Sequence, residues 1–268
     1  MLKKGLIMAG IFTLLTSLLT SCSAEPEKKV VRKPKSNPIT EELVNASWSS
    51  GGGMNGGHNS SEIRKEKNGD CWVVITKKPS HDAKQVETKI KVSAKDLRQL
   101  FDHMNKHFSY KKWKDFPQSQ FQALDAPTYT VSMTVKGTDG KHNYYNGFST
   151  QDFPGVEGRA FRDIRCFVES YAAVNVKTYQ FHCSDFDGSP QPATIIIDDP
   201  GLVRVETNKK YRSTVGTNTG SRFDITFTLY GRIPGKTKAH LTSLRPEGKV
   251  YYDVVVDDNF NLSVTEAK

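Results

Sequence analysis

Two histidines offer the most specific pair of ligand atoms in the sequence. His103 and His107 are four residues apart in a segment with helical periodicity, so they lie one turn apart, as in zinc-binding helices. The stretch reads His103-Met104-Asn105-Lys106-His107 and lacks the glutamate that follows the first histidine in metalloprotease helices. Both histidines also fall outside the apolar face of the predicted helix. We therefore expect this side of the helix to be solvated, and we predict no metal site.

The other candidate sites lack residues that their chemistry needs. Residues 185–189 and 257–261 offer oxygen ligands in turns, but neither segment has the glycine and glutamate of a calcium-binding loop. The glycine-rich segment 51–57 has no following Lys-Ser/Thr pair, so it indicates a wide or bulged hairpin rather than a nucleotide-binding loop. His182 and Cys183 are neighbours on a predicted strand and point to opposite faces. The sequence thus predicts no catalytic residue, no cofactor and no enzyme activity.

Four cysteines occur along the chain, at positions 22, 71, 166 and 183, without a Cys-x-x-Cys motif. This spacing excludes a zinc ribbon and a disulfide-dense scaffold. Cys166 lies opposite the apolar face of its predicted helix. Two alternatives remain: a disulfide between Cys166 and Cys183, which export would permit, or three reduced thiols with Cys71 and Cys183 packed in sheets.

The N-terminus has the pattern of an export signal. Lys3 and Lys4 precede an apolar stretch at residues 6–19. The following Leu19-Thr20-Ser21-Cys22 resembles the bacterial lipobox, which implies that Cys22 becomes an acylated N-terminus anchored in the membrane. The alternative is an ordinary signal peptide with an incidental cysteine. Ser23 follows instead of aspartate, so in a cell with two membranes we expect the outer one.

Charge and composition limit the partners further. Residues 22–42 hold three prolines and mixed charges, which predicts a disordered tether after the lipidated cysteine. The net charge of the chain is +9, but no basic run longer than two residues occurs in its folded part. Nucleic-acid binding requires a clustered basic stripe, so we exclude nucleic acid as a partner. We expect an exported, lipid-anchored protein with an unidentified protein partner.

Residues 43–174 predict an α+β domain, an antiparallel sheet with two helices, because strand and helix patterns are segregated along the chain. Ser93 and Asp96 have capping-box spacing at the start of the first helix. Its apolar face comprises Leu97, Leu100, Phe101, Met104 and Phe108. The predicted strands are 44–50, 61–66, 71–77, 86–92, 129–135 and 144–148, and the second helix is 155–173.

The same half resembles an uncharacterised domain of secreted proteins and lipoproteins from anaerobic gut-type bacteria. The resemblance implies no activity, because none is known for that domain. The residues that carry it are Trp48-Ser49-Ser50 before the glycines, Trp113 and Phe116, Leu124-Asp125-Ala126-Pro127, and Phe153-Pro154 before Phe161.

Residues 176–268 predict an all-β region of immunoglobulin-like sandwich type, because short strands recur at close spacing without a helix pattern. Phe223, Ile225, Phe227 and Leu229 alternate along one of them. The seven predicted strands are 176–182, 194–198, 202–207, 223–230, 237–243, 250–256 and 260–265.

The loops of this region resemble those of chagasin-type inhibitors of papain-like cysteine proteases. The resemblance implies inhibitory loops at 188–194, 216–222 and 245–248, carried by Ser189, Pro190, Gly220, Arg222, Arg245 and Pro246. The first loop lacks the family's Thr-Gly-aromatic sequence, and Glu247 replaces an aromatic residue after Pro246. Aromatic anchors supply much of the binding energy at such interfaces. We therefore expect a non-catalytic binding or scaffolding lipoprotein, with protease inhibition as the alternative.

Overall fold

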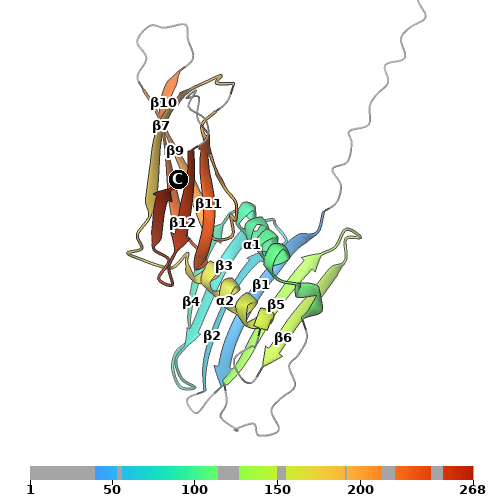
Figure 1. Ribbon diagram of the computed structural model, residues 1–268. Helices are drawn as coiled ribbons and strands as arrows, with labels where there is room; N and C mark the ends of the chain where they lie inside the picture. The colour runs from blue at the N-terminus through green and yellow to red at the C-terminus, as the bar shows by residue number, and fades with distance from the viewer. Residues whose placement is uncertain are drawn as a thin grey trace, which may run out of the picture. The chain divides into compact units, whose positions relative to one another are not determined.

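A six-stranded antiparallel sheet with two helices against one face occupies the first part of the described chain (Figure 1). This computed structural model describes residues 40–52, 56–113, 127–149, 155–190, 192–212, 221–242 and 250–267. The strand order is β4-β3-β2-β1-β5-β6. The strands are β1 (Glu42–Gly52), β2 (Gly57–Lys65), β3 (Cys71–Lys78), β4 (Val86–Val92), β5 (Pro127–Lys136) and β6 (His142–Ser149). The helices α1 (Ala94–His107) and α2 (Gly155–Glu169) both contact β1 and β2.

Alternating apolar residues explain why one face of this sheet is covered. Ala46 pairs with Ile63 of β2 and Met133 of β5, and Ile63 in turn pairs with Val73 of β3. All four of these side chains are buried, and they form one continuous row across the strands beneath the helices. Because successive strand residues point to opposite faces, such a row needs alternation in every strand at once.

The sequence determines the start and the inner face of α1. The Asp96 carboxylate accepts hydrogen bonds from the backbone N–H of Ser93 (2.9 Å) and from its hydroxyl (2.6 Å), which satisfies donors at the first turn. The five apolar residues predicted for the inner face are all buried, as expected for an amphipathic helix on a sheet. In α2, Phe167 is fully buried as well.

Two further antiparallel sheets follow in the second part of the chain. One has the order β7-β10-β9 and the other β13-β12-β11-β8. Apolar side chains from both meet between them; for example, the rings of Phe181 and Tyr252 have centroids 4.7 Å apart. The strands are β7 (Tyr179–Phe186), β8 (Thr194–Ile197), β9 (Val203–Tyr211), β10 (Arg222–Gly231), β11 (Gly235–Thr242), β12 (Val250–Val256) and β13 (Leu262–Glu266).

The predicted strands and helices are present, with shifted ends. Helix α2 ends at Glu169 instead of residue 173, and β7 begins at Tyr179 instead of residue 176. The alternation predicted for β10 is confirmed, because all four of its inward apolar side chains are buried. Residues Thr40–Lys268 form one compact unit. Among the residues that the structure describes, no helix is both long and apolar enough to cross a bilayer.

Of the two alternatives for the cysteines, the disulfide between Cys166 and Cys183 is not formed in the structure. Cys71, Cys166 and Cys183 are free cysteines. Cys183 shares the inward face of β7 with Phe181, where it packs against the core of the two sheets. Burial raises the pKa of all three thiols, to about 11 for Cys166, which makes them poor nucleophiles at neutral pH.

Candidate functional site

Helix α1 buries a second, polar side against the later part of the chain. Asp96, Gln99, His103 and His107 recur at intervals of three or four residues and therefore share one face. Asp96 and His103 are only 8% and 4% exposed. The prediction that the histidine side of this helix is solvated is therefore wrong for His103. The reason is tertiary: the turn after β8 and the residue after β10 pack against this face.

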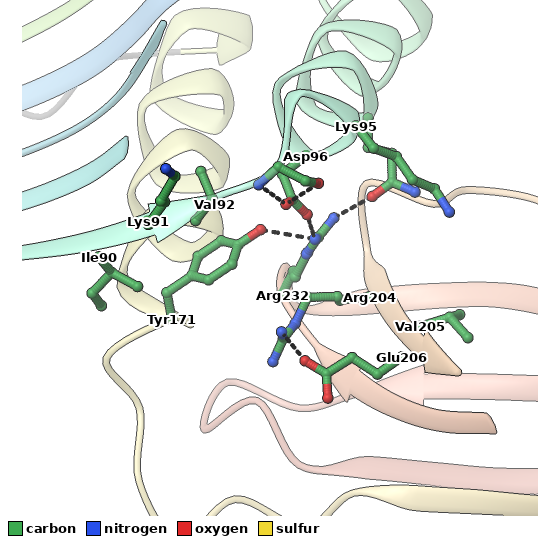
Figure 2. Close-up of a pocket in the computed structure, with 12 residues that line it drawn as sticks. Ile90, Lys91, Val92, Lys95, Asp96, Tyr171, Arg204, Val205, Glu206 and Arg232 are labelled. Carbon is green, nitrogen blue, oxygen red and sulfur yellow. Dashed lines mark hydrogen bonds and ion pairs between the residues drawn. The ribbon is translucent and has the colours of Figure 1, made fainter. Parts of the chain in front are cut away.

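Arg232, directly after β10, reaches α1 as the largest fully buried side chain of the described residues (Figure 2). Its guanidinium contacts the Asp96 carboxylate, donates to Gln99 Oε1 (2.5 Å) and donates to the Tyr171 hydroxyl oxygen (2.8 Å). The side chain is 1% exposed, and Phe167 lies with its ring centroid 4.6 Å from the guanidinium carbon. One arginine thus connects the end of β10 to both helices of the first part.

In the cluster of Arg232, Asp96, Gln99 and Tyr171, the positive charge of Arg232 is balanced by the negative charge of Asp96. Burial raises the pKa of Asp96, but the charge of Arg232 and the hydrogen bonds from Ser93 outweigh burial, so the net pKa is lowered and the carboxylate stays ionised. Burial also raises the pKa of Tyr171, whose hydroxyl therefore remains neutral. A buried ion pair of this kind needs both partners, because either charge alone would lie desolvated.

A pocket of about 520 Å³ opens beside this cluster, between β4, the start of α1 and strand β9. Arg204 and Glu206 of β9 lie on its wall and form an ion pair with each other. Lys91 and Lys95 add positive charge from the opposite wall. Acidic and basic groups both line this pocket, so its chemistry does not select one class of ligand.

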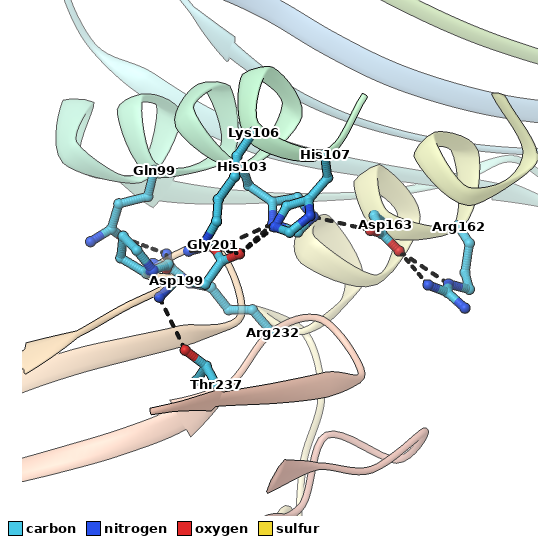
Figure 3. Close-up of polar contacts among 11 residues, drawn as sticks. Gln99, His103, Lys106, His107, Arg162, Asp163, Asp199, Gly201, Arg232 and Thr237 are labelled. Carbon is cyan, nitrogen blue, oxygen red and sulfur yellow. Dashed lines mark hydrogen bonds and ion pairs between the residues drawn. The ribbon is translucent and has the colours of Figure 1, made fainter. Parts of the chain in front are cut away.

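Three side chains converge at the other end of the same helix face (Figure 3). The Nδ1 atom of His103 lies 3.3 Å from each carboxylate oxygen of Asp199, and His107 Nε2 lies 2.6 Å from Asp199 Oδ2. On its far side, His103 Nε2 lies 3.0 Å from Oδ2 of Asp163, a residue of α2. Lys106 Nζ approaches Asp199 Oδ2 at 3.5 Å. The ligand atoms of His103, His107 and Asp199 all lie within 4.8 Å of one another.

The turn between β8 and β9 fixes the position of the Asp199 carboxylate. The Asp199 backbone N–H donates to Thr237 Oγ1 (3.0 Å), and the Gly201 N–H donates to Asp199 Oδ1 (3.1 Å). A Cβ at position 201 would lie 2.5 Å from His103 Cβ, far closer than real Cβ contacts. Glycine at this position therefore permits the turn to approach α1 closely enough for Asp199 to meet both histidines.

The carboxylates around His103 favour the protonated form of its imidazole. Burial lowers the pKa of His103, but its hydrogen bonds to Asp163 and Asp199, together with their charges, outweigh burial and raise it. For Asp199, burial raises the pKa, and the opposing contacts with His103 and His107 lower it well below the usual range for aspartate. The site thus consists of a buried, ionised carboxylate that faces one buried imidazole and one partly exposed imidazole.

Of the residues predicted for inhibitory loops, those that the structure describes lie at one end of the two-sheet region. Ser189 and Pro190 lie between β7 and β8, and Arg222 begins β10. Gly220, Arg245 and Pro246 fall outside the residues that the structure describes, as does the lipidation candidate Cys22. Register nevertheless brings the flanking strand ends together, as the pairs Arg222↔Phe186, Phe223↔Tyr211, Thr242↔Thr194 and Leu241↔Val250 show.

A hydrogen bond from a backbone N–H to a side-chain carboxylate joins the two sheets at this end. Asp185 Oδ2 of β7 accepts a hydrogen bond from the Ala193 N–H just before β8 (2.7 Å). The strand ends that flank the predicted loops 188–194, 216–222 and 245–248 therefore lie at the same end of the region. The opposite end carries Asp199 and Arg232 and contacts α1.

Sequence reasoning missed Arg232, Asp163 and Asp199 as partners of α1. The recurrence of polar residues at positions 96, 99, 103 and 107 was the available signal, since it marks a continuous polar stripe beside the apolar one. Comparison with known proteins adds no assignment: no protein-family model matches the chain, and no curated protein matches it at a significant level.

Proposed function

We propose that this protein is an exported, lipid-anchored binding protein without catalytic activity, attached at Cys22. In this proposal the second part of the chain is an immunoglobulin-like sandwich that follows an α+β domain. The sandwich presents the three predicted loops, 188–194, 216–222 and 245–248, to a protein partner. The observation that carries the proposal is the convergence of the strand ends that flank these three segments.

The contacts at the α1-facing end of the two-sheet region support the proposal that the opposite end binds a partner. Arg232 and Asp199 hold one end of the two sheets against α1 through buried polar contacts, so the other end is presented by a rigid scaffold. Loops positioned by a rigid scaffold are common sites of recognition, since little conformational entropy is lost on binding. A tether at residues 22–42 would let this end reach partners beyond the membrane surface.

Site-specific photo-crosslinking tests the binding proposal in the full chain. A photoreactive residue that replaces Pro190 probes the proposed binding end. The matched control replaces Lys236, an exposed residue at the start of β11, near the end that contacts α1. We expect a discrete adduct in cells from position 190 and none from position 236. Equal adducts from both positions, or none from position 190, would contradict the proposal.

A second candidate function is inhibition of papain-like cysteine proteases through the same segments. The convergence of three segments at one end favours it specifically, because an inhibitor of this kind must fill one cleft with several loops. The test is residual papain activity with increasing amounts of the full chain in detergent. Inhibition at one equivalent that is lost in R245A/P246A but kept in K236A would support it, and undiminished papain activity at micromolar excess would refute it.

A further inference from the structure

The facing atoms of His103 and Asp199 need a cation between them. Both oxygens of Asp163 are engaged: Oδ1 accepts from Arg162 (2.9 and 3.0 Å), and Oδ2 lies 3.0 Å from His103 Nε2. An ionised carboxylate can only accept, so the proton of His103 belongs on Nε2. In a neutral imidazole this leaves Nδ1 as a lone pair that faces two carboxylate oxygens at 3.3 Å each. Either a second proton or a metal ion must lie between these acceptors.

A single metal ion could bind all three of the side chains that meet here, because their ligand atoms lie within 4.8 Å of one another. His107 Nε2 points to the same oxygen of Asp199 at 2.6 Å, and Lys106 Nζ lies 3.5 Å from it. Without a metal ion, His107 meets this oxygen by donating its Nε2 proton, and the Lys106 ammonium lies beside the same carboxylate. One divalent ion would displace the protons on His103 Nδ1 and His107 Nε2 and would bind both ring nitrogens at this point.

We propose that His103 Nδ1, His107 Nε2 and the Asp199 carboxylate bind a divalent cation of the zinc class. Two imidazoles and one carboxylate suit such borderline ions, and three protein ligands leave a fourth position for water. This site goes beyond the proposed binding function and does not depend on it.

The distances fit this ion after a small adjustment. Metal–ligand bonds of about 2.0–2.1 Å place the ligand atoms of a tetrahedral site about 3.3 Å apart. His103 Nδ1 already lies 3.3 Å from Asp199, and only His107 is too close, at 2.6 Å. The side chain of His107 is 40% exposed, so it has room to move outward and leaves a route for the ion from solvent.

The surroundings have the features of a supported metal site. Asp163 orients His103 through its other ring nitrogen, as carboxylates do for metal-bound histidines, and Arg162 holds Asp163 in turn. Asp199 is positioned by the Thr237 and Gly201 contacts rather than by the histidines alone. Because the ligands come from α1 and the β8–β9 turn, the ion would link the two parts of the described chain.

Calorimetric titration of Zn²⁺ into the chelator-stripped full chain in detergent tests the site. We expect one equivalent to bind, and one equivalent of Co²⁺ to give the visible absorption of a four-coordinate ion. H107Q should weaken zinc binding at least tenfold, and D163N should weaken it by about 10- to 100-fold, as outer-shell substitutions do. The matched control is H182Q, because His182 is exposed on β7 and its ring contacts the hydroxyl of Thr226 on the neighbouring strand.

The variants also separate loss of binding from loss of folding. His107 is partly exposed, so H107Q should keep the unfolding midpoint of the metal-free protein, whereas zinc should raise the midpoint of the wild type and of H182Q but not of H107Q. Two results would overturn the proposal: less than one equivalent of zinc bound by the wild type at millimolar concentration, or equal zinc affinity in the wild type and H107Q.

Discussion

The two ends of the two-sheet region each carry an arginine–aspartate pair, in opposite environments. At the α1-facing end, Arg232 and Asp96 have side chains that are 1% and 12% exposed. At the other end, Arg212 donates to Asp224 at 2.6 and 3.1 Å, but these side chains are 54% and 46% exposed. Hydrogen-bond geometry is good in the exposed pair, so geometry alone does not distinguish the two.

The difference lies in what each pair would leave behind if one partner were removed. Loss of Arg232 leaves the Asp96 carboxylate and the Gln99 and Tyr171 groups inside the protein without a cation. Loss of Arg212 leaves Asp224 and Ser184 in contact with water. Buried pairs are costly to break and exposed pairs are not, so removal of Arg232 should destabilise the fold far more than removal of Arg212.

The largest expected effect is that of R232A. Because it strands a buried carboxylate, we expect a loss of about 3–5 kcal/mol in the free energy of unfolding, measured by urea denaturation of the full chain in detergent. The double variant D96A/R232A should lose less than the sum of D96A and R232A, since the pair is removed together. Additive losses would show that Arg232 acts through packing against Phe167 rather than through its charge.

Close packing at the same end gives the next largest effect. In G201A the new methyl group would meet His103 Cβ at 2.5 Å, and that atom lies too near the α1 backbone to move aside cheaply. We expect G201A to lower the free energy of unfolding by about 1–3 kcal/mol in the same urea experiment, as overpacking does. An unchanged urea midpoint would mean that the β8–β9 turn shifts away from α1 without cost.

Local pattern was sufficient to predict most elements but not the contacts between them. The capping residues Ser93 and Asp96 and the alternation in β10 act within a few residues, so the sequence predicts where those elements begin and which face is buried. The Arg232–Asp96 contact spans 136 residues and the His103–Asp199 contact spans 96. No periodicity encodes such a pairing, because it depends on how finished elements pack. The polar stripe on α1 indicated that a partner exists, but not which one.

The pH dependence of the free energy of unfolding tests whether the charge of Asp96 stabilises the folded protein. The folded-state pKa of Asp96 is lowered, so its contribution is fully present above its unfolded pKa, about 3.9, and is lost as pH falls through the folded value. We expect the stability difference between the wild type and D96N to be largest at neutral pH and to shrink below about pH 4. Urea midpoints from pH 3 to 7 measure this. A difference that is constant over that range would show that the pKa of Asp96 is the same in the folded and the unfolded protein, so that Arg232 does not lower it.

The smallest expected effect is that of R212A. The Asp224 pKa is lowered to about 2 by the hydrogen bonds from Arg212 and Ser184, yet both charges of the pair are solvated and screened by salt. We expect the urea midpoint of R212A to equal that of the wild type within error at physiological ionic strength, in contrast to R232A. This variant therefore changes the charge of the proposed binding end without changing the fold. If R212A weakens the crosslink from position 190 while the midpoint stays constant, the exposed pair serves recognition. A midpoint shift as large as that of R232A would instead show that the two ends are equally structural.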